Sequence, residues 1–380
     1  MVLQVLPSLV TGGVERGTID VAQALVQAGW KALVASAGGP LVRELDRAGA
    51  QHITMPVDSK NPLVMRANVK RLAAVIAEHG VDIVHARSRA PAWSAEAAAR
   101  RAGAHFVTTF HGTYSLGWLG LKRRYNAVMT RGERVIAISR FIAEHAETVY
   151  HIDPARVRVI HRGIDLGRFD PARVSQERII QLAQRWRLPD GFRVVMLPGR
   201  ITRWKGHEVL IEALARLGRH DIRCLMVGSD QGRAGYVAEL KAMAARLGLA
   251  DVVHLVGECN DLPAAYMLTD VVVSASTDPE AFGRVIVEAQ AMGRPVIAAN
   301  LGAGGEVVRD GATGVLVPPG DPAALAGALA RILDMSAEAR AAMARDAMAF
   351  ARESFPRERM CALTLDVYRE VLGGGGANGA

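Results

Sequence analysis

Two glutamates, Glu280 and Glu288, lie eight positions apart in the stretch DPEAFGRVIVEAQAMGRPV, with Gly283 between them. In a continuous helix they would be about 12 Å apart. That exceeds the roughly 5–9.5 Å of a glycosidase carboxyl pair and is too far for a shared dinuclear metal. TDPEAF and Gly283 instead predict that Glu280 precedes a helix that begins near Val285, with Glu288 on about its first turn. Such spacing suits two carboxylates that bind the two ends of one long ligand. The alternative is that Glu280 and Glu288 bind no ligand and are only residues near a helix end, where the helix dipole favours a negative charge.

The residues between the glutamates could bind an anion, because the first N–H groups of a helix have no partner within it. The backbone donors would come from Phe282, Gly283, Arg284 and Val285. In LPGRITRWKGHEVL, Arg200 and Lys205 follow another predicted strand, and Gly206 opens a helix. An arginine fork and a lysine point charge would stabilise a departing diphosphate. The alternative is that Arg200 and Lys205 are two exposed cations of a loop and bind no ligand.

Two further candidates lie in the N-terminal half. Gly12 and Gly13 stand between the first predicted strand and the first helix, where backbone N–H groups can approach a ligand. His111 follows a predicted strand in TTFHGTY, with a purely structural histidine as the alternative. The Gly12–Gly13 stretch is not the G-x-G-x-x-G fingerprint and is not followed by the Lys-Ser/Thr of a P-loop, and no G-x-S-x-G elbow occurs. It also lacks HExxH and Asp-x-Asp, so we expect no catalytic metal.

Short β-branched runs alternate with alanine-rich amphipathic segments, which is typical of parallel βαβ units. The pattern begins with VLQVL and VERGTIDVAQALVQAG and starts again with FRVVMLPGR and GHEVLIEALARLGR. We therefore expect an α/β protein with two doubly wound Rossmann-like domains that face each other across a cleft, with ligands at the carboxyl ends of the strands. The expected parts are domains over 1–172 and 173–352, a helix over 353–372 that returns to the first domain, and a disordered tail over 373–380.

The positive charge of the chain is concentrated in its first half. The formal net charge is +8, and residues 1–170 hold 22 Lys and Arg against 14 Asp and Glu. This favours an anionic partner such as an acidic lipid or a phosphorylated substrate, with a solvated basic surface as the alternative. Nucleic acid is disfavoured, because aromatic residues make up only 5% of the chain and are not interleaved with basic ones.

The sequence also indicates a compartment. Three scattered cysteines suit a reducing environment. The apolar start has no basic region before it and is interrupted by Pro7, so it predicts a first strand rather than a signal peptide. No uninterrupted apolar run reaches the roughly 18 residues of a membrane span. We expect a cytoplasmic protein.

Taken together, these motifs resemble a known family. PEAFGRVIVEAQAMGRPV, followed by GGEVVRDGATGVLVPPGDPAALAGAL, resembles the C-terminal signature of the family 4 (group 1) glycosyltransferases, which are retaining enzymes of GT-B fold. The segments TGGVER, HGTY, AISRFIAEH, VIHRGIDLGRFDP and PGRITRWKG occur in the order and approximate spacing of that family. The resemblance covers nearly the whole chain. It implies metal-independent transfer of a hexose-type sugar from a UDP- or GDP-linked donor, with no other cofactor.

The resemblance also implies a role for each candidate in the C-terminal half. Glu280 would bind hydroxyls of the transferred sugar, and Glu288 would bind the ribose of the nucleotide. The backbone of residues 282–285 would hold sugar and phosphate. Arg284 stands where many relatives carry a small apolar residue, so its side chain could alter the choice of donor.

The remaining roles concern the diphosphate, the sugar and the base. Arg200 and Lys205 would grip the diphosphate, and Gly13 would contact it from the other domain. His111 would reach the donor sugar. The base would meet the GECND loop through Glu258 and Cys259.

The nearer bacterial members build surface polysaccharides and lipopolysaccharide, on acceptors that are anionic and membrane-bound. The resemblance thus implies a cell-envelope glycan or glycolipid as acceptor, such as lipopolysaccharide core or exopolysaccharide. It also implies that the N-terminal domain binds this acceptor and that the C-terminal domain binds the nucleotide sugar. We expect peripheral contact with the inner face of the cytoplasmic membrane through Arg87, Arg89, Lys122, Arg123 and Arg124. Two alternatives stay open: a GT-B sugar-nucleotide epimerase, which would need no acceptor, and a non-catalytic nucleotide-sugar-binding protein.

Overall fold

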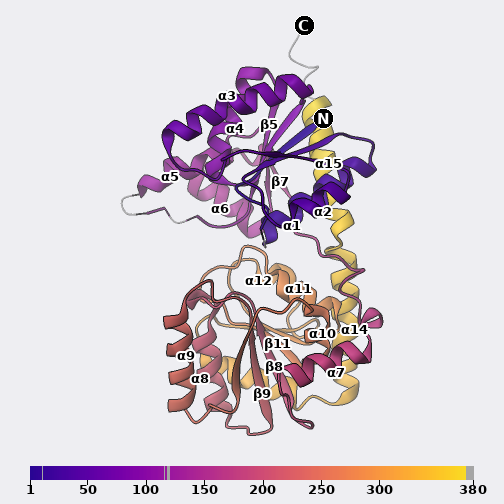
Figure 1. Cartoon of the computed structure of the whole chain (residues 1–380). Coiled ribbons are helices and arrows are strands. Elements are labelled where there is room, and N and C mark those ends of the chain that lie inside the picture. Colours follow the sequence, from indigo (N-terminus) through magenta and orange to yellow (C-terminus); the bar gives the residue numbers. More distant parts are fainter. Residues whose placement is uncertain (11, 115, 118–119, 374–380) are drawn as a thin grey trace. The chain divides into compact units, whose positions relative to one another are not determined.

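A computed structural model describes residues 1–10, 12–114, 116–117 and 120–373. The chain forms two compact units, one made of Met1–Gly163 with the segment from Arg357 onward, and one made of Ile164–Pro356 (Figure 1). The tail expected at the C-terminus lies outside the described residues, apart from Gly373.

The first unit is built on a seven-stranded parallel sheet with the order β3-β2-β1-β4-β5-β6-β7. The strands alternate along the chain with helices, as the βαβ pattern predicts, and those at the centre are buried. Burial on both faces explains their continuous apolar sequences. Their bounds are β1 Val2–Val5, β2 Ala32–Ser36, β3 Gln51–Thr54, β4 Ile83–Ala86, β5 His105–Phe110, β6 Arg134–Ala137 and β7 Val157–Val159.

Helices cover both faces of this sheet (Figure 1). The helices α3 and α4 pack on each other on one face, and α1 packs with α2 and α15 on the other. The α-helices are α1 Gly13–Gln27, α2 Val42–Arg47, α3 Pro62–His79, α4 Arg89–Ala102, α5 Leu121–Asn126, α6 Arg140–Tyr150 and α15 Arg357–Gly373. The 3-10 helices that the structure describes in this unit are η2 Ala127–Thr130 and η3 Pro154–Arg156.

The second unit repeats the same architecture with a six-stranded parallel sheet of order β10-β9-β8-β11-β12-β13. The chain begins at the central strand β8, adds strands outward to β10, and then crosses back to β11 on the other side of β8. The strands are β8 Arg193–Pro198, β9 Ile222–Val227, β10 Val253–Gly257, β11 Val271–Ser274, β12 Val296–Ala299 and β13 Val315–Val317. Both units are therefore Rossmann-like, as expected.

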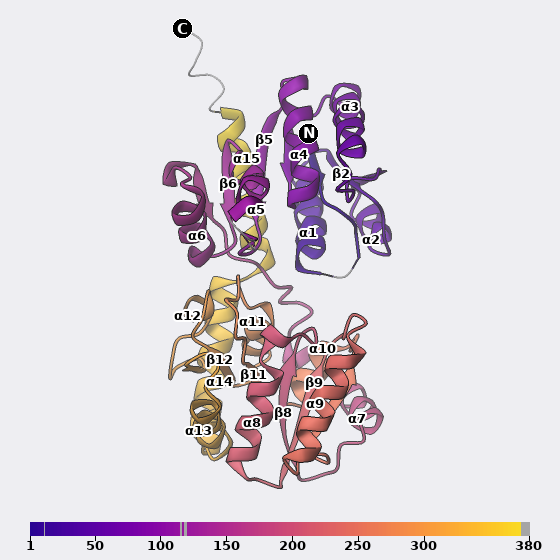
Figure 2. The ribbon, with the colours of Figure 1, turned by 90° about the vertical axis from the view of Figure 1, so that its left-hand side faces the viewer.

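In the second unit α8 packs with α9 and α13, and Figure 2 looks onto the face that carries α8 and α9. The helices α10 and α11 lie behind the strands in that view and pack against α7 and α14. The α-helices are α7 Gln176–Arg185, α8 His207–Leu217, α9 Ala234–Arg246, α10 Leu262–Met267, α11 Arg284–Ala291, α12 Gly304–Val307, α13 Pro322–Leu333 and α14 Ala337–Ser354. The 3-10 helices are η4 Pro171–Arg173 and η5 Arg203–Lys205.

The first unit ends at Gly163, whereas the sequence suggested residue 172. The reason is that the following segment packs within the second unit. The Ile164 N–H donates to the Phe355 carbonyl at 2.9 Å, and the Phe169 ring lies 6.1 Å from that of Tyr266 between centroids. At the other end, the long helical pattern breaks at Pro356 into α14 and α15, because proline cannot donate the backbone hydrogen bond of a helix interior.

The last helix, α15, completes the core of the first unit. Its residues Met360, Leu365 and Tyr368 are buried together with apolar residues of β1, β2 and α1. The Tyr368 hydroxyl shares a hydrogen bond of 2.6 Å with Nδ1 of His85 on β4. In the part of the chain that the structure describes, no helix combines the length and the apolarity needed to cross a membrane.

Candidate active site

Lys205 and Glu280 form an ion pair at the carboxyl edge of the second sheet. Lys205 ends η5, which follows β8, and Glu280 lies in the loop after β11. These strands are neighbours, and the chain order reverses between them, which is where doubly wound sheets bind ligands. The Ser276 hydroxyl donates to the same Glu280 oxygen, Oε1, at 2.7 Å. Exposures of 12% for Lys205 and 14% for Glu280 leave the pair largely desolvated but reachable.

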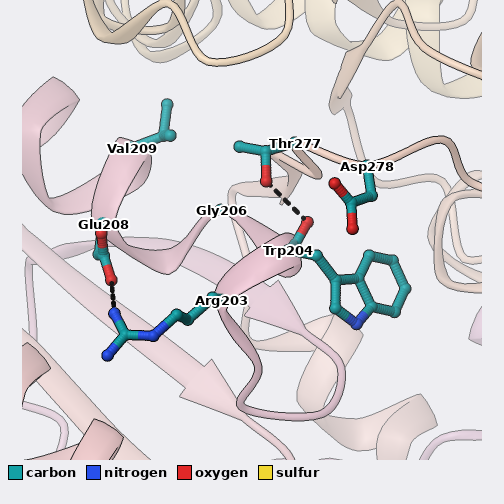
Figure 3. Close-up of a pocket in the computed structure, with 7 residues that line it drawn as sticks. All are labelled: Arg203, Trp204, Gly206, Glu208, Val209, Thr277 and Asp278. Carbon is teal, nitrogen blue, oxygen red and sulfur yellow. Dashed lines mark hydrogen bonds and ion pairs between the residues drawn. The ribbon is translucent and has the colours of Figure 1, made fainter. Parts of the chain in front are cut away.

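Gly206 allows the two loops to come this close. Its φ of 71° is in the left-handed region, and a Cβ there would lie 1.8 Å from the carbonyl oxygen of Ala275. Only glycine fits without moving the backbone. The Thr277 N–H donates to the Trp204 carbonyl at 2.8 Å, and Figure 3 shows that the Thr277 hydroxyl points to the same oxygen. The loop after β8 is thereby fastened to the loop after β11.

Glu288 lies inside α11, and Glu280 precedes that helix, which confirms the predicted helix start to within one residue. Glu288 is only 2% exposed, and both of its carboxylate oxygens are engaged. The Tyr266 hydroxyl donates to Oε2 at 3.1 Å, and Arg284 donates to Oε1 at 2.8 Å across one helical turn. Burial and the Glu288 charge raise the pKa of Tyr266 well above its usual value. The carboxylate is therefore held in one fixed position.

Gly283 caps α11 with a φ of 90°, so the chain turns sharply into the helix. The side chain of Phe282 is 3% exposed, and its ring lies 5.5 Å from that of Phe355 between centroids in an edge-to-face contact. Its side chain thus belongs to the core, and only its backbone could serve a ligand. The Val285 carbonyl lies 3.3 Å from the Tyr266 hydroxyl.

The other candidates of this unit are more exposed. Arg200 follows β8 and makes no hydrogen bond or ion pair with any residue that the structure describes, so it does not join the Lys205–Glu280 pair directly. Glu258 is exposed and Cys259 is half-buried in the loop after β10, at the same edge of the sheet. Burial raises the pKa of the Cys259 thiol, which argues against a thiolate nucleophile.

His111 and Gly13 lie at the carboxyl edge of the first sheet. Gly13 opens α1, and its carbonyl accepts a hydrogen bond from Arg162. His111 directly follows β5, and its Nε2 is buried with no hydrogen-bond partner among the described residues. Burial, with the charges of Arg87 and Arg162, holds the pKa of His111 well below its usual value. His111 is therefore a neutral imidazole near pH 7.

The expected membrane-facing set needs a correction. Arg87 is only 3% exposed and donates to Gln4 Oε1 at 3.0 Å, so it cannot reach a lipid surface. Arg89 is half-buried, donates to Asn126 at 2.9 Å, and stacks over the Tyr114 ring at 4.1 Å. A charge count along the chain does not reveal these buried guanidinium groups. Three residues of the set are exposed on α5: Lys122, Arg123 and Arg124.

No three histidine, cysteine, aspartate or glutamate side chains gather into a metal-binding group within the described ranges. The charged groups instead form two pairs of opposite charge: Lys205 of η5 with Glu280 of the loop after β11, and Arg284 with Glu288 on α11. A fixed ammonium beside a helix N-terminus can hold an anionic group, and the carboxylates can accept hydrogen bonds from hydroxyls. The arrangement suits a ligand that carries both phosphate and sugar.

Sequence reasoning missed three contributors to this site. Tyr266 and Ser276 orient the two glutamates, and Trp204 precedes Lys205 on η5. Tyr266 and Ser276 carry no local signal, because their roles depend on which strands are neighbours. Trp204 could have been found, since a tryptophan in the predicted loop RWKG stands out in a chain with five tryptophans.

Comparison with known proteins agrees with this geometry. Residues 11–168 match the family described as "Glycosyltransferase Family 4", and residues 179–349 match "Glycosyl transferases group 1". The crystal structure of a glycosyltransferase from Rickettsia africae superposes with a TM-score of 0.91 at 38% identity, over 100% of this chain and 99% of the other. Anabaena HepE in complex with UDP and glucose gives 0.84 at 26% identity, over 97% and 99%.

Curated relatives match over a smaller part. A D-inositol 3-phosphate glycosyltransferase from Salinispora tropica is 38% identical over 258 residues, which is 64% of this chain and 52% of the relative. The chain spans about half the length of such relatives. The two family matches, the near-complete superposition on the Rickettsia enzyme and the two GT-B sheets lead to one conclusion: the chain belongs to the group 1, family 4 glycosyltransferases.

Proposed function

We propose that this protein is a retaining, metal-independent glycosyltransferase that transfers a hexose-type sugar from a UDP- or GDP-linked donor to a cell-envelope glycan or glycolipid. The observation that carries the proposal is the Lys205–Glu280 ion pair at the strand crossover of the second sheet. HepE, which is bound to UDP and glucose in its crystal structure, supports a nucleotide-sugar donor.

In this proposal the donor diphosphate lies between the N-terminus of α11 and the cations Lys205 and Arg200. These cations neutralise the charge that develops as the diphosphate leaves, which is the task a metal ion performs in other transferases. Glu280 accepts hydrogen bonds from sugar hydroxyls, and Glu288, fixed by Tyr266 and Arg284, accepts them from the ribose. His111, as a neutral imidazole, can exchange a hydrogen bond with a donor-sugar hydroxyl.

Retention follows if the acceptor attacks from the face that the diphosphate vacates. The leaving diphosphate then takes the proton of the acceptor hydroxyl, so no enzymic nucleophile is required. Glu280 is the carboxylate that this proposal places at the sugar, but its Oε1 is already bound by Ser276 and by the Lys205 ammonium. Both partners lower its nucleophilicity, which supports a binding role.

Binding of the nucleotide is the first test. Isothermal titration of wild-type protein with UDP, GDP, ADP and dTDP, without metal, should show one preferred base. Lys205→Ala should weaken that binding at least tenfold, because it removes a charge-assisted hydrogen bond. Lys241→Ala, an exposed lysine on α9, is the matched control and should bind as wild type. The proposal fails if no nucleotide binds, or if the two variants behave alike.

Turnover separates the alternatives. A glycosyltransferase releases nucleoside diphosphate at a rate that rises with acceptor, whereas an epimerase converts the donor without acceptor and a binding protein does neither. Two acceptors should be tested: an inner-membrane lipid extract and D-inositol 3-phosphate. The second is included because the curated relatives are D-inositol 3-phosphate glycosyltransferases. Proton NMR of the product's anomeric signal decides between retention and inversion.

The membrane part of the proposal rests on the three exposed basic residues of α5: Lys122, Arg123 and Arg124. Each lysine or arginine near an anionic surface contributes about 1 kcal/mol of attraction. Charge reversal at all three positions should abolish co-sedimentation with phosphatidylglycerol vesicles at low salt. Reversal of Arg43, Arg47 and Lys31, which are exposed elsewhere in this unit, is the control. Unchanged sedimentation of the α5 variant would contradict the proposed contact.

A further inference from the structure

The helix α4 begins where the chain order of the first sheet reverses. Only Arg87 and Ser88 separate the last residue of β4 from Arg89, the first residue of α4. The sheet order β2-β1-β4-β5 places this reversal between β1 and β4, which pair in parallel. Doubly wound sheets bind ligands at such a point, at the carboxyl ends of the strands. No residue of this β4–α4 connection belongs to the proposed donor site.

The N-terminus of α4 lacks the side-chain cap that a serine usually provides. Ser88 and Ser139 are the N-cap residues of α4 and α6, with a φ of −160° at both. The Ser139 hydroxyl accepts a hydrogen bond from the Ile142 N–H, three residues further on, at 3.1 Å. In α4 that position is Pro91, which has no N–H, and Ser88 makes no cap hydrogen bond. The Ser88 hydroxyl and the first two N–H groups of α4 therefore lack partners within the helix.

Two guanidinium groups flank Ser88 without a carboxylate partner. Among the residues that the structure describes, Arg87 donates to the amide oxygen of Gln4 and Arg89 to that of Asn126, and neither forms an ion pair. Arg87 is buried, and its Nε has no hydrogen-bond partner within the described ranges. The first turn of α4 contains no acidic residue. Positive charge is therefore left uncompensated at this helix N-terminus, where the helix dipole adds to it.

This excess of positive charge favours an anion as the ligand. Burial lowers the pKa of Arg87 below its usual value, and the acidic residues Asp20 and Glu15 of α1 offset this effect only in part. A buried cation without a charged partner costs free energy, which an anion at the helix N-terminus would recover. A phosphate suits the donors better than a carboxylate, because a hydroxyl, two N–H groups and a cation match three terminal oxygens rather than two. Ser88 and Arg89 are half-buried, so a ligand can reach them.

We propose that the N-terminus of α4 binds a phosphate group of the acceptor, through the Ser88 hydroxyl and the N–H groups of Arg89 and Ala90. The inference rests on the proposed function and deepens it, because it names the chemical group by which the first unit recognises the acceptor. The guanidinium of Arg89 neutralises the phosphate, and the buried Arg87 adds its charge without touching the ligand. The phosphate is bound and not transferred, so it stays on the product.

Calorimetric titration of the full-length protein with inorganic phosphate tests this site, with the preferred nucleoside diphosphate at saturation so that the donor site is filled. Wild type should bind phosphate with a millimolar or lower Kd. Ser88→Ala and Arg89→Gln should each weaken this binding about tenfold or more, because a hydrogen bond to a charged group or a neighbouring cation is lost. The matched controls are Ser139→Ala, at the N-cap of α6, and Arg100→Gln, exposed in the last turn of α4, and both should bind phosphate as wild type. Ser139→Ala should lower the unfolding temperature and Ser88→Ala should not, because only Ser139 makes a cap hydrogen bond.

A transfer assay with an acceptor that supports turnover assigns the phosphate to a substrate. Added inorganic phosphate should raise the KM for the acceptor and leave the KM for the nucleotide sugar unchanged, and the reverse pattern would overturn the acceptor role. If nucleotide binds normally but phosphate does not, or if Ser88→Ala and Arg89→Gln bind phosphate like the controls, the phosphate site is refuted while the donor function stands. If nucleotide binding itself is absent, the proposed function fails as well.

Discussion

Glu280→Gln and Lys205→Met should change nucleotide binding in opposite directions. The Lys205 ammonium is bound by Glu280, so a diphosphate can bind the ammonium only by weakening that pair. Glu280→Gln keeps the size of the side chain and its hydrogen bond with Ser276 but removes the competing charge. Lys205→Met keeps the length and apolar packing of the lysine but removes the cation that the diphosphate needs.

The magnitude follows from the burial of the pair. With exposures of 12% and 14%, the pair is largely desolvated, and leaving one charge of such a pair alone costs on the order of 3–5 kcal/mol. An incoming diphosphate recovers part of that cost in Glu280→Gln. Recovery of about 1.4 kcal/mol already gives tenfold tighter binding. Lys205→Met loses a charge-assisted hydrogen bond of about 1.5–3 kcal/mol, which is roughly a 10- to 150-fold loss of affinity.

The assay is titration calorimetry with the preferred nucleoside diphosphate, without sugar, at fixed ionic strength. We expect the Kd to fall for Glu280→Gln and to rise for Lys205→Met. Turnover of the nucleotide sugar should fall in both variants, because Glu280 is needed for the sugar and Lys205 for the leaving group. If Glu280→Gln weakens nucleoside diphosphate binding as much as Lys205→Met does, the two residues do not compete, and the reasoning is refuted.

Three further outcomes test local features. Tyr266→Phe removes the hydroxyl that fixes the buried Glu288 carboxylate, so the free energy of unfolding in a urea titration should fall by about 1–3 kcal/mol. An unchanged urea midpoint would show that this hydrogen bond does not stabilise the protein. Gly206→Ala places a Cβ 1.8 Å from the Ala275 carbonyl oxygen, so both the unfolding temperature and the turnover should fall. Wild-type values for both would refute the close approach of Gly206 to the Ala275 backbone. Burial lowers the pKa of His207 to about 4 from 6.5, so the unfolded chain takes up this proton first and stability is lost as the pH falls from 6.5 toward 4, by up to about 3 kcal/mol. His207→Gln should flatten the dependence of the urea midpoint on pH in that window, and an unaltered slope would count against it.

The sequence predicts the fold and the local geometry around the glutamates well. The TDPEAF run and Gly283 place the start of α11, and alternating strands and helices predict two parallel sheets. These features depend on short-range rules: turn residues, helix caps and periodicity. They needed no knowledge of which strands become neighbours.

The pairing of Lys205 with Glu280 could not be predicted in this way. The two residues are 75 positions apart and meet only because β11 lies beside β8, while β9 and β10 lie on the other side. The same holds for Tyr266, which reaches Glu288 from α10. Sequence reasoning gave Lys205 and Glu280 separate ligand roles, and the structure adds that they bind each other.

Arg87 shows the opposite error. The excess of Lys and Arg in the first half of the chain suggested a solvent-facing cation, but Arg87 directly follows the central strand β4 and is buried at the end of that strand. Its burial is stabilised by a hydrogen bond to Gln4 on the neighbouring strand β1. Linear charge patterns do not distinguish such a residue from Lys122 on α5, because burial is a property of the packed sheet.

Release of nucleoside diphosphate from the preferred nucleotide sugar, in the presence of an accepted acceptor and EDTA, tests the central claim most directly. Wild type and the exposed control Lys241→Met should turn over alike, and Lys205→Met should lower kcat by about 100-fold or more, as expected for loss of a group that stabilises the leaving charge. Equal turnover of Lys205→Met and Lys241→Met would contradict the claim that the Lys205–Glu280 pair forms the donor site.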